Sequence, residues 1–177
     1  MGDSRLATPD GGAPHAPTSA GPARLSPGSS DARGTMVANA LGQLGQPYRY
    51  GGAAPGGFDC SGLVFYAAAG AGVHVPRTAS EQRRWGTAVA RNDLEPGDLI
   101  FMHLPGKMHL SRKEMHVGIA LGGSRFIHAP ASGGHVRIDS IAAAPYAQGF
   151  IAARRIIDAA ASAGTLSSRA EPRGSPP

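Results

Sequence analysis

Two kinds of hydrophobic pattern follow each other along this chain, a helical one first and a strand-like one after it. Helical spacing predicts a first helix with Thr35 as its N-cap, ended by Gly45 and Pro47; its apolar residues are Met36, Val37, Ala40, Leu41 and Leu44. The run CSGLVFYAAAG predicts a second helix from Cys60 to Gly70 or Gly72. A short third helix is expected from Thr78 to Trp85, where Thr78 and Ser80 can act as caps.

The second half of the chain predicts strands. Five short runs are rich in β-branched and aromatic residues: Leu99–Met102, His116–Leu121, Arg125–His128, Val136–Ile138 and Phe150–Ala153. Most gaps between them are too short for the crossovers that parallel strands need, so antiparallel pairing is expected. The sequence therefore predicts an α+β fold, with N-terminal helices packed on a mainly antiparallel sheet of about five strands.

Composition limits the folded part to one domain. The 177 residues include 26 glycines and 15 prolines, many of them near the two ends. Residues 1–34 form a Pro/Gly/Ser/Ala-rich segment that we expect to be disordered. One catalytic domain over 35–158 and a disordered tail over 159–177 complete the expected organisation.

The formal charge of +5 and the pI near 10.0 suit a partner with anionic groups. Nucleic acid is disfavoured, because the arginines are scattered and few aromatic residues are available for base stacking. No stretch approaches the roughly 20 apolar residues of a membrane span. The N-terminus lacks the hydrophobic region of a signal peptide, so we expect either a leader outside this sequence or another export route.

Cys60 is the single cysteine, which excludes a disulfide within the chain. A cysteine is nucleophilic as thiolate, and a helix N-terminus and a nearby imidazole would both lower its pKa. The alternative is that Cys60 is a small buried apolar residue. Its polar and glycine neighbours, Asp59, Ser61 and Gly62, argue against burial.

Two histidines lie on consecutive predicted strands. If residues 122–124 form a three-residue hairpin loop, Leu121 pairs with Arg125 and Gly118 lies opposite His128. His116 and His128 then share a face as diagonal neighbours, and Gly118 leaves space for their rings. We expect the helix that begins at Cys60 to pack on this face. A two-residue loop would instead place the two rings on opposite faces.

The other histidines have less specific surroundings. A metal site built from His103, His109 and His116 is conceivable, but no HxH or CxxC spacing supports it. We expect neither a metal nor a cofactor.

The chain resembles the NlpC/P60 cysteine peptidases, which belong to the papain-like grouping. The resemblance runs from about Leu41 to Arg155 and rests on the segments PYRYGG, FDCSGLV, VPRTASEQ, GDLIFM, HVGIALG and FIHAP in that order. It implies that Cys60 is the nucleophile, His116 the general base and His128 the residue that orients His116. Tyr48 matches a tyrosine that helps to stabilise the oxyanion, and Tyr50 is a competitor for that position.

The resemblance also implies a substrate, the stem peptides or cross-links of peptidoglycan, with the cleaved bond left open. Asp59, Ser61 and Arg77 are expected to bind charged ends of the substrate. We expect a monomer in the bacterial cell envelope, periplasmic or secreted. The 103–115 segment could be a solvated flap or could bind wall carboxylates; the flap is favoured. The alternatives with the same fold are an antibacterial effector that hydrolyses peptidoglycan, an acyltransferase or thioesterase, and a non-catalytic module that binds the cell wall.

Overall fold

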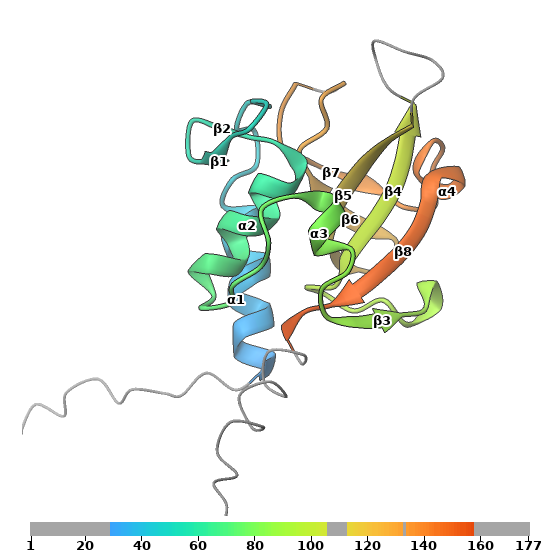
Figure 1. Ribbon diagram of the computed structural model, residues 1–177, viewed down its shortest axis with the longest axis horizontal. Coiled ribbons are helices and arrows are strands. Elements are labelled where there is room, and N and C mark those ends of the chain that lie inside the picture. The colour runs from blue at the N-terminus through green and yellow to red at the C-terminus, as the bar shows by residue number, and fades with distance from the viewer. Residues whose placement is uncertain (1–28, 106–112, 133, 158–177) are drawn as a thin grey trace, which may run out of the picture.

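The computed structural model describes residues 29–105, 113–132 and 134–157 (Figure 1). The helices are α1 (Ser29–Leu41), α2 (Cys60–Gly70), α3 (Ala79–Gln82), the 3-10 helix η1 (Arg91–Asp93) and α4 (Tyr146–Gly149). The strands are β1 (Ala53–Ala54), β2 (Gly57–Phe58), β3 (Thr87–Val89), β4 (Leu99–Pro105), β5 (Lys113–Gly122), β6 (Arg125–His128), β7 (Arg137–Ser140) and β8 (Phe150–Arg155).

The main sheet has six strands in the order β3-β8-β4-β5-β6-β7, and every neighbouring pair is antiparallel. The predicted α+β class with a mainly antiparallel sheet is therefore confirmed. The sixth strand is β3, whose three residues are too few and too exposed to give a hydrophobic pattern. The small β1–β2 hairpin lies in the segment that the sequence predicts as loop.

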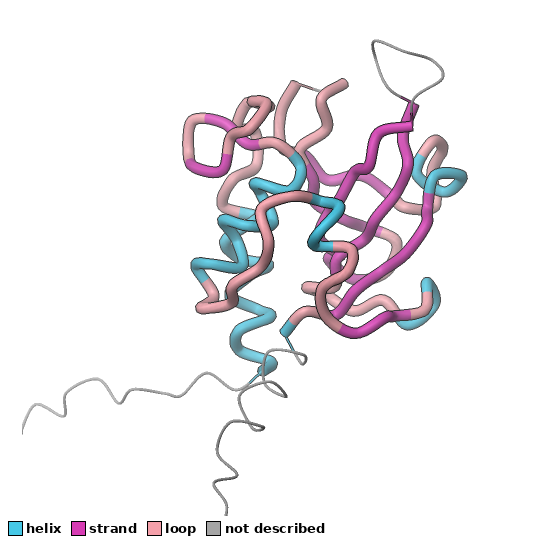
Figure 2. Tube along the Cα trace, viewed as in Figure 1, coloured by secondary structure: helices cyan, strands magenta, loops and turns pink. Residues whose placement is uncertain are grey.

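Helices α1 and α2 lie side by side and cover one face of the sheet (Figures 1 and 2). Leu63 and Val64 of α2 pack there with Val117 and Ile119 of β5 and with Ile127 of β6. The opposite face carries a second cluster of Ile100, Met102, Ala120, Phe126, Ile141 and Tyr146. None of the helices within the described ranges is long and apolar enough to cross a membrane.

Helix α1 begins six residues earlier than the predicted N-cap at Thr35, so that prediction is wrong. Arg33 lies in the first part of the helix and forms ion pairs with Glu95 at 2.7 Å and Asp98 at 3.2 Å. Asp98 is fully buried and also pairs with Arg155 at 2.9 Å. These partners are more than 60 residues away from Arg33 in sequence, so local patterns cannot predict them.

Much of the segment expected as a flap between residues 103 and 115 belongs to a hairpin. β4 continues to Pro105 and β5 begins at Lys113, and these two residues are cross-strand partners. His103 pairs with Met115 in the same ladder. The remaining part, 106–112, lies outside the described residues.

The turn between β5 and β6 is tighter than predicted. Gly122 pairs with Arg125, so the connection has two residues, and Leu121 forms a bulge between this pair and Ala120–Phe126. Gly122 has a φ of +95°, which favours glycine. The bulged residue Leu121 restores the predicted register. Ile119 pairs with Ile127, and one step further Gly118 lies opposite His128.

Candidate active site

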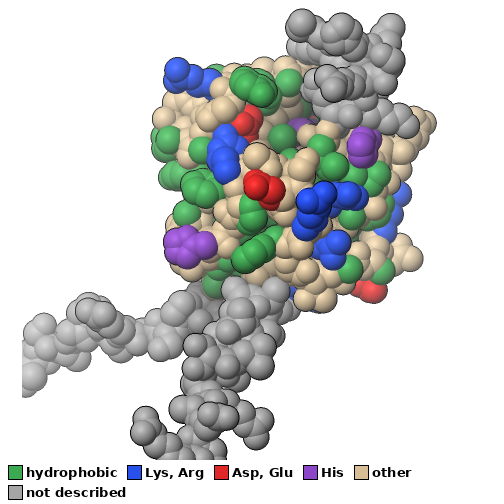
Figure 3. Space-filling model, viewed as in Figure 1, with side chains coloured by type: hydrophobic (Ala, Val, Ile, Leu, Met, Phe, Trp, Pro, Cys, Tyr) green, Lys and Arg blue, Asp and Glu red, His purple; other side chains and the backbone are tan. Residues whose placement is uncertain are grey.

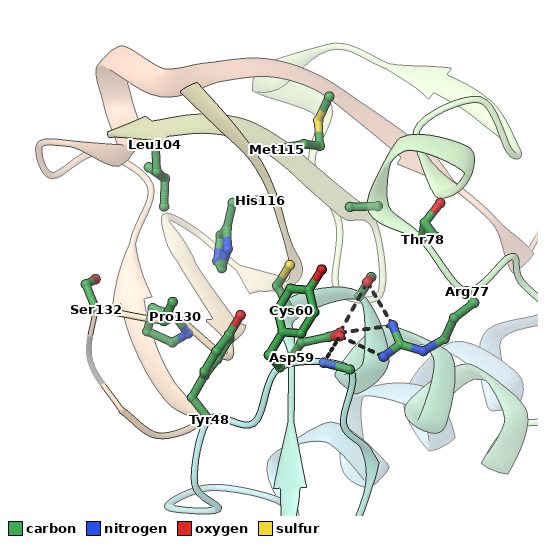
Figure 4. A pocket seen from close by; sticks show the side chains of 15 residues that line it. Tyr48, Asp59, Cys60, Arg77, Thr78, Leu104, Met115, His116, Pro130 and Ser132 are labelled. Carbon is green, nitrogen blue, oxygen red and sulfur yellow. Dashed lines mark hydrogen bonds and ion pairs between the residues drawn. The ribbon is translucent and has the colours of Figure 1, made fainter. Parts of the chain in front are cut away.

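Cys60 is the first residue of α2, and Asp59 forms the N-cap of the helix. The Asp59 side chain accepts a hydrogen bond from the backbone N–H of Gly62 at 2.6 Å, which fixes the first turn. Gly62 has to lack a side chain, because a Cβ would collide with the carbonyl oxygen of Gly52. Cys60 is half-buried, and its sulfur lies at the pocket of Figure 4, as the sequence predicts.

The pocket has a volume of about 840 Å³. In Figure 4 the side chains of Asp59, Arg77 and Thr78 lie on one side of it, which we call the polar side, and those of Leu104, Pro130 and Ser132 lie on the other. Cys60, His116 and Tyr48 line the same pocket, and Figure 4 shows the sulfur and the imidazole beside each other. Such a volume suits a small peptide.

His116 and His128 lie on one face of the sheet, as predicted. The Nε2 atom of His116 is 2.8 Å from the Nδ1 atom of His128, and their rings meet edge to face at a centroid distance of 5.0 Å. Both side chains are buried, His128 completely. The Phe126 ring packs closest to Gly118, since a Cβ on Gly118 would lie 2.6 Å from it.

The expected packing of α2 on the histidine face is wrong. His116 pairs with Met102, so its side chain lies on the face of the second cluster, whereas α2 packs against Val117 on the other face. Cys60, at the N-terminal end of α2, and His116 nevertheless line the same pocket. There, the backbone of Val117 hydrogen-bonds the Cys60 thiol.

A third group adjoins the two histidines, and the sequence analysis does not include it. The Nε2 atom of His128 lies 2.9 Å from Oδ2 of Asp139 on β7. The same oxygen accepts hydrogen bonds from the Tyr146 hydroxyl at 2.6 Å and from Nε of Arg137 at 2.8 Å. Arg137 also donates to the Tyr146 hydroxyl at 3.1 Å. The polar chain thus runs from His116 through His128 to Asp139.

Asp139 was not predicted as a site residue, because its position depends on the pairing of β7 with β6, which no local sequence signal determines. It pairs with Phe126 in the β6–β7 ladder and is therefore the diagonal neighbour of His128, which pairs with Arg137. The connection between β6 and β7 has no recognisable turn length, so this register could not be derived. Only the alternation of Arg137 and Asp139 on one face of a strand could have given a signal.

Both histidines are held in the neutral form. Burial lowers the pKa of His116 to about 3, and the nearby His128 and Arg137 contribute to this decrease. Burial also lowers the pKa of His128 to about 4, although the hydrogen bond to Asp139 opposes it. His116 is therefore a neutral imidazole at neutral pH.

Cys60 differs from the expectation of a lowered pKa. Burial raises the pKa of its thiol, the hydrogen bond from the backbone of Val117 lowers it, and the charge of Asp59 raises it further. The pKa is raised overall, so the resting site pairs a neutral thiol with a neutral imidazole.

The neutral histidines predict a loss of stability in acid. In the unfolded chain both histidines titrate near pH 6.5, and in the folded chain near 3 and 4. Between these values the unfolded chain binds more protons, so the free energy of unfolding decreases as the pH falls below about 6.5. Urea unfolding between about pH 7 and pH 4.5 measures this slope.

Replacing both histidines by glutamine should flatten the slope, whereas the same change at the exposed His74 should leave it unaltered. A free energy of unfolding that stays constant over this pH range in the unaltered protein would contradict the prediction.

Asp59, Ser61 and Arg77, the predicted substrate-binding residues, all line the pocket. They also bind one another: Arg77 donates to both carboxylate oxygens of Asp59, at 3.0 and 2.7 Å, and to the Ser61 hydroxyl at 3.0 Å. Burial raises the pKa of Asp59, but the hydrogen bonds from Arg77 and Gly62 bring it below its usual value. Asp59 is thus an anion that organises the start of α2.

Tyr48 and Tyr50 both line the pocket. Figure 4 shows the Tyr48 side chain extending into it beside Cys60. The Tyr48 backbone is fixed by an N–H donated to the Gly134 carbonyl at 2.8 Å, whereas Tyr50 is 91% exposed. The position of Tyr48 is therefore the better defined of the two.

His103 does not join this site. His103 neighbours Met102, the partner of His116, and so points to the opposite face of the sheet from His116. His109 lies outside the described residues. Within 29–105, 113–132 and 134–157, no three His, Cys, Asp or Glu side chains are grouped in a way that could hold a metal ion.

Comparisons with known proteins identify relatives of this chain. The chain is 44% identical over 119 residues to the probable endopeptidase YafL of Escherichia coli K12, a match that covers 65% of this chain and 46% of YafL. It is 37% identical over 119 residues to the murein DD-endopeptidase MepH of the same organism, covering 65% of this chain and 42% of MepH. The chain thus spans less than half the length of these relatives.

Solved structures show the same fold. The peptidoglycan hydrolase RipB of Mycobacterium tuberculosis superposes with a TM-score of 0.60 at 32% identity, over 72% of this chain and 66% of RipB. An NlpC/P60 family protein of Bacillus cereus superposes with a TM-score of 0.63 at 32% identity, over 71% of this chain and 40% of that protein. The sequence profile of the NlpC/P60 family matches residues 45–155, which include Cys60, His116, His128 and Asp139. The chain therefore belongs to the NlpC/P60 family.

Proposed function

We propose that this protein is a cysteine endopeptidase that hydrolyses peptide bonds in the stem peptides or cross-links of bacterial peptidoglycan. The observation that carries the proposal is the placement of Cys60 at one pocket with His116, whose ring is held by the buried His128. The names of MepH and RipB, a murein endopeptidase and a peptidoglycan hydrolase, support the substrate class.

The two ring nitrogens of His116 have different roles in the proposed reaction. Nε2 of His116 is engaged with His128, so Nδ1 is the nitrogen left for the thiol. In the proposed reaction, Nδ1 takes the Cys60 proton while the sulfur attacks the substrate carbonyl carbon. Nδ1 then returns that proton to the leaving amine, which gives an acyl-enzyme thioester. A water molecule, deprotonated by His116, hydrolyses the thioester and restores the thiol.

The tetrahedral intermediate carries negative charge on its oxygen and needs hydrogen-bond donors. The backbone N–H of Cys60, at the start of α2, supplies one in this proposal, and the Tyr48 hydroxyl supplies the other. The helix N-terminus adds a partial positive charge at the same place.

Tyr48→Phe tests this assignment. Loss of one oxyanion donor should lower kcat by about 10²- to 10³-fold, because the donor acts mainly on the transition state. Tyr50→Phe is the matched control, since it removes the same hydroxyl from a more exposed tyrosine at the same pocket, and kcat should stay near that of the unaltered protein. Equal kcat values for the two variants would contradict the role of Tyr48.

We propose that the polar side of the pocket binds the charged end of the stem peptide. Asp59 and Arg77 offer a paired carboxylate and guanidinium there, with Ser61 between them. The basic side chains visible in Figure 3 stand in separate groups among acidic, hydrophobic and other side chains. This scattered pattern suits general attraction to an anionic wall better than a continuous track for nucleic acid.

Purified muropeptides of known structure, monomeric and cross-linked, test the proposed function directly. Incubation with the full chain should give products whose masses correspond to hydrolysis of one kind of peptide bond. A thioesterase or acyltransferase would leave the muropeptides intact, and a wall-binding module would bind them without cleavage. The products also identify the bond. We propose that the protein acts in the bacterial envelope, either in the periplasm or after secretion.

A further inference from the structure

We infer that Asp139 is a positioning residue that sets the tautomers of both histidines, so that Nδ1 of His116 is the unprotonated nitrogen facing Cys60. The catalytic part of this inference rests on the proposed function. The structural part concerns the protonation of two buried rings and can be tested without a substrate.

The tautomers follow from Asp139 in three steps. An ionised carboxylate only accepts hydrogen bonds, so Nε2 of His128, 2.9 Å away, has to carry a proton. A neutral His128 protonated on Nε2 has a lone pair on Nδ1. That lone pair accepts a proton donated by Nε2 of His116 at 2.8 Å. A neutral His116 protonated on Nε2 then has its own lone pair on Nδ1, where the thiol proton is to be received.

Without Asp139 the opposite arrangement is available. His128 protonated on Nδ1 would donate to Nε2 of His116, and His116 would then carry its proton on Nδ1. In that form His116 cannot accept a proton from Cys60. The distance between the two rings permits both arrangements, so a neighbour of the rings has to select one, and Asp139 is the anion that contacts His128.

The surroundings keep Asp139 ionised. Burial raises the pKa of this carboxyl, but hydrogen bonds from Tyr146, Arg137 and His128 together lower it to about 2. Tyr146 and Arg137 donate to Oδ2, the same oxygen that faces His128. Tyr146 and Phe126 also pack against the His128 ring, with centroid distances of 5.3 and 4.5 Å, so packing restrains the position of the ring as well.

The charged and titratable groups facing His128 among the described residues are therefore His116, Asp139, Arg137 and Tyr146. Only Asp139 among them is an anion that touches His128. Asp139 does not line the pocket, so it acts on the substrate only through the histidines.

Nitrogen-15 NMR of the histidine rings near pH 7.5 tests the inference. In the unaltered protein both His116 and His128 should be protonated on Nε2. Asp139→Leu removes the acceptor and Asp139→Asn offers a donor as well as an acceptor, so each should show a population protonated on Nδ1. Tyr146→Phe keeps the carboxylate and should keep the tautomers. Asp93→Asn removes an exposed carboxylate elsewhere and should change nothing.

In the muropeptide assay, both Asp139 variants should lower kcat by about 10- to 100-fold with little change in KM, a smaller loss than for a carboxylate that touches the catalytic histidine itself. Unaltered tautomers in the folded Asp139→Asn or Asp139→Leu protein would overturn the inference, even if kcat fell. If Asp139→Leu does not fold, Asp139→Asn alone decides. Changed tautomers in a protein that cleaves no muropeptide would support the inference and reject the proposed function.

Discussion

Cys60→Ala should abolish muropeptide cleavage, with a loss of at least about 10⁴-fold in kcat/KM. The physical reason is that in the proposed reaction the sulfur forms the acyl-enzyme bond, and no second cysteine exists in the chain to replace it. The measurement is product formation from purified muropeptides, followed by mass spectrometry. Cys60 is half-buried and its replacement only shortens the side chain, so the variant should fold and can be compared at equal concentration.

The single cysteine also provides an independent control. Iodoacetamide should add one group to the unaltered protein and none to Cys60→Ala, and activity should fall in proportion to the labelled fraction. Cleavage by Cys60→Ala at the rate of the unaltered protein would show that the reaction does not use this thiol, and the proposed mechanism would have to be abandoned.

His116→Gln should lower kcat by about 10²- to 10⁴-fold, as is typical when a general base is removed. Because the resting thiol has a raised pKa, it depends on His116 to take its proton during attack. Alkylation of Cys60 at neutral pH should therefore slow in the same variant, which separates loss of the base from loss of substrate binding. KM should change little.

His74→Gln is the matched control for this experiment. His74 is exposed and lies outside the pocket, so its replacement should leave both kcat and the alkylation rate unaltered. An unchanged kcat in His116→Gln would refute the assignment of the base. Loss of kcat with unchanged alkylation would show instead that His116 acts on the leaving group and not on the thiol.

The sequence predicts those parts of the fold that depend on local pattern. The α2 helix begins at Cys60 because Asp59 caps it, and both the cap and the apolar run can be read from neighbouring residues. The start of α1 could not be predicted, since it depends on the distant partners of Arg33. The extended ends of β4 and β5 depend on pairing with each other, which adds polar residues that no hydrophobic pattern marks.

The contact between His116 and His128 was predicted correctly, although the turn from which it was predicted was wrong. A two-residue turn by itself would have separated the rings, but the bulge at Leu121 compensates for the missing residue. Bulges depend on backbone pairing and leave little trace in sequence. The same limit explains why Asp139 was not predicted as a neighbour of His128. The pairing register of β7 against β6, which brings the two residues together, could not be derived from the sequence.

The attachment of α1 has a consequence for how the domain can be produced in isolation. The family match begins at residue 45, yet Met36 and Ala40 are completely buried in the core that α2 and β5 share. A fragment cut at the matched boundary would lack one wall of that core and both ion pairs of Arg33, and would expose apolar surface to solvent. The smallest autonomous folding unit is therefore longer at its N-terminal side than the stretch that sequence similarity delimits.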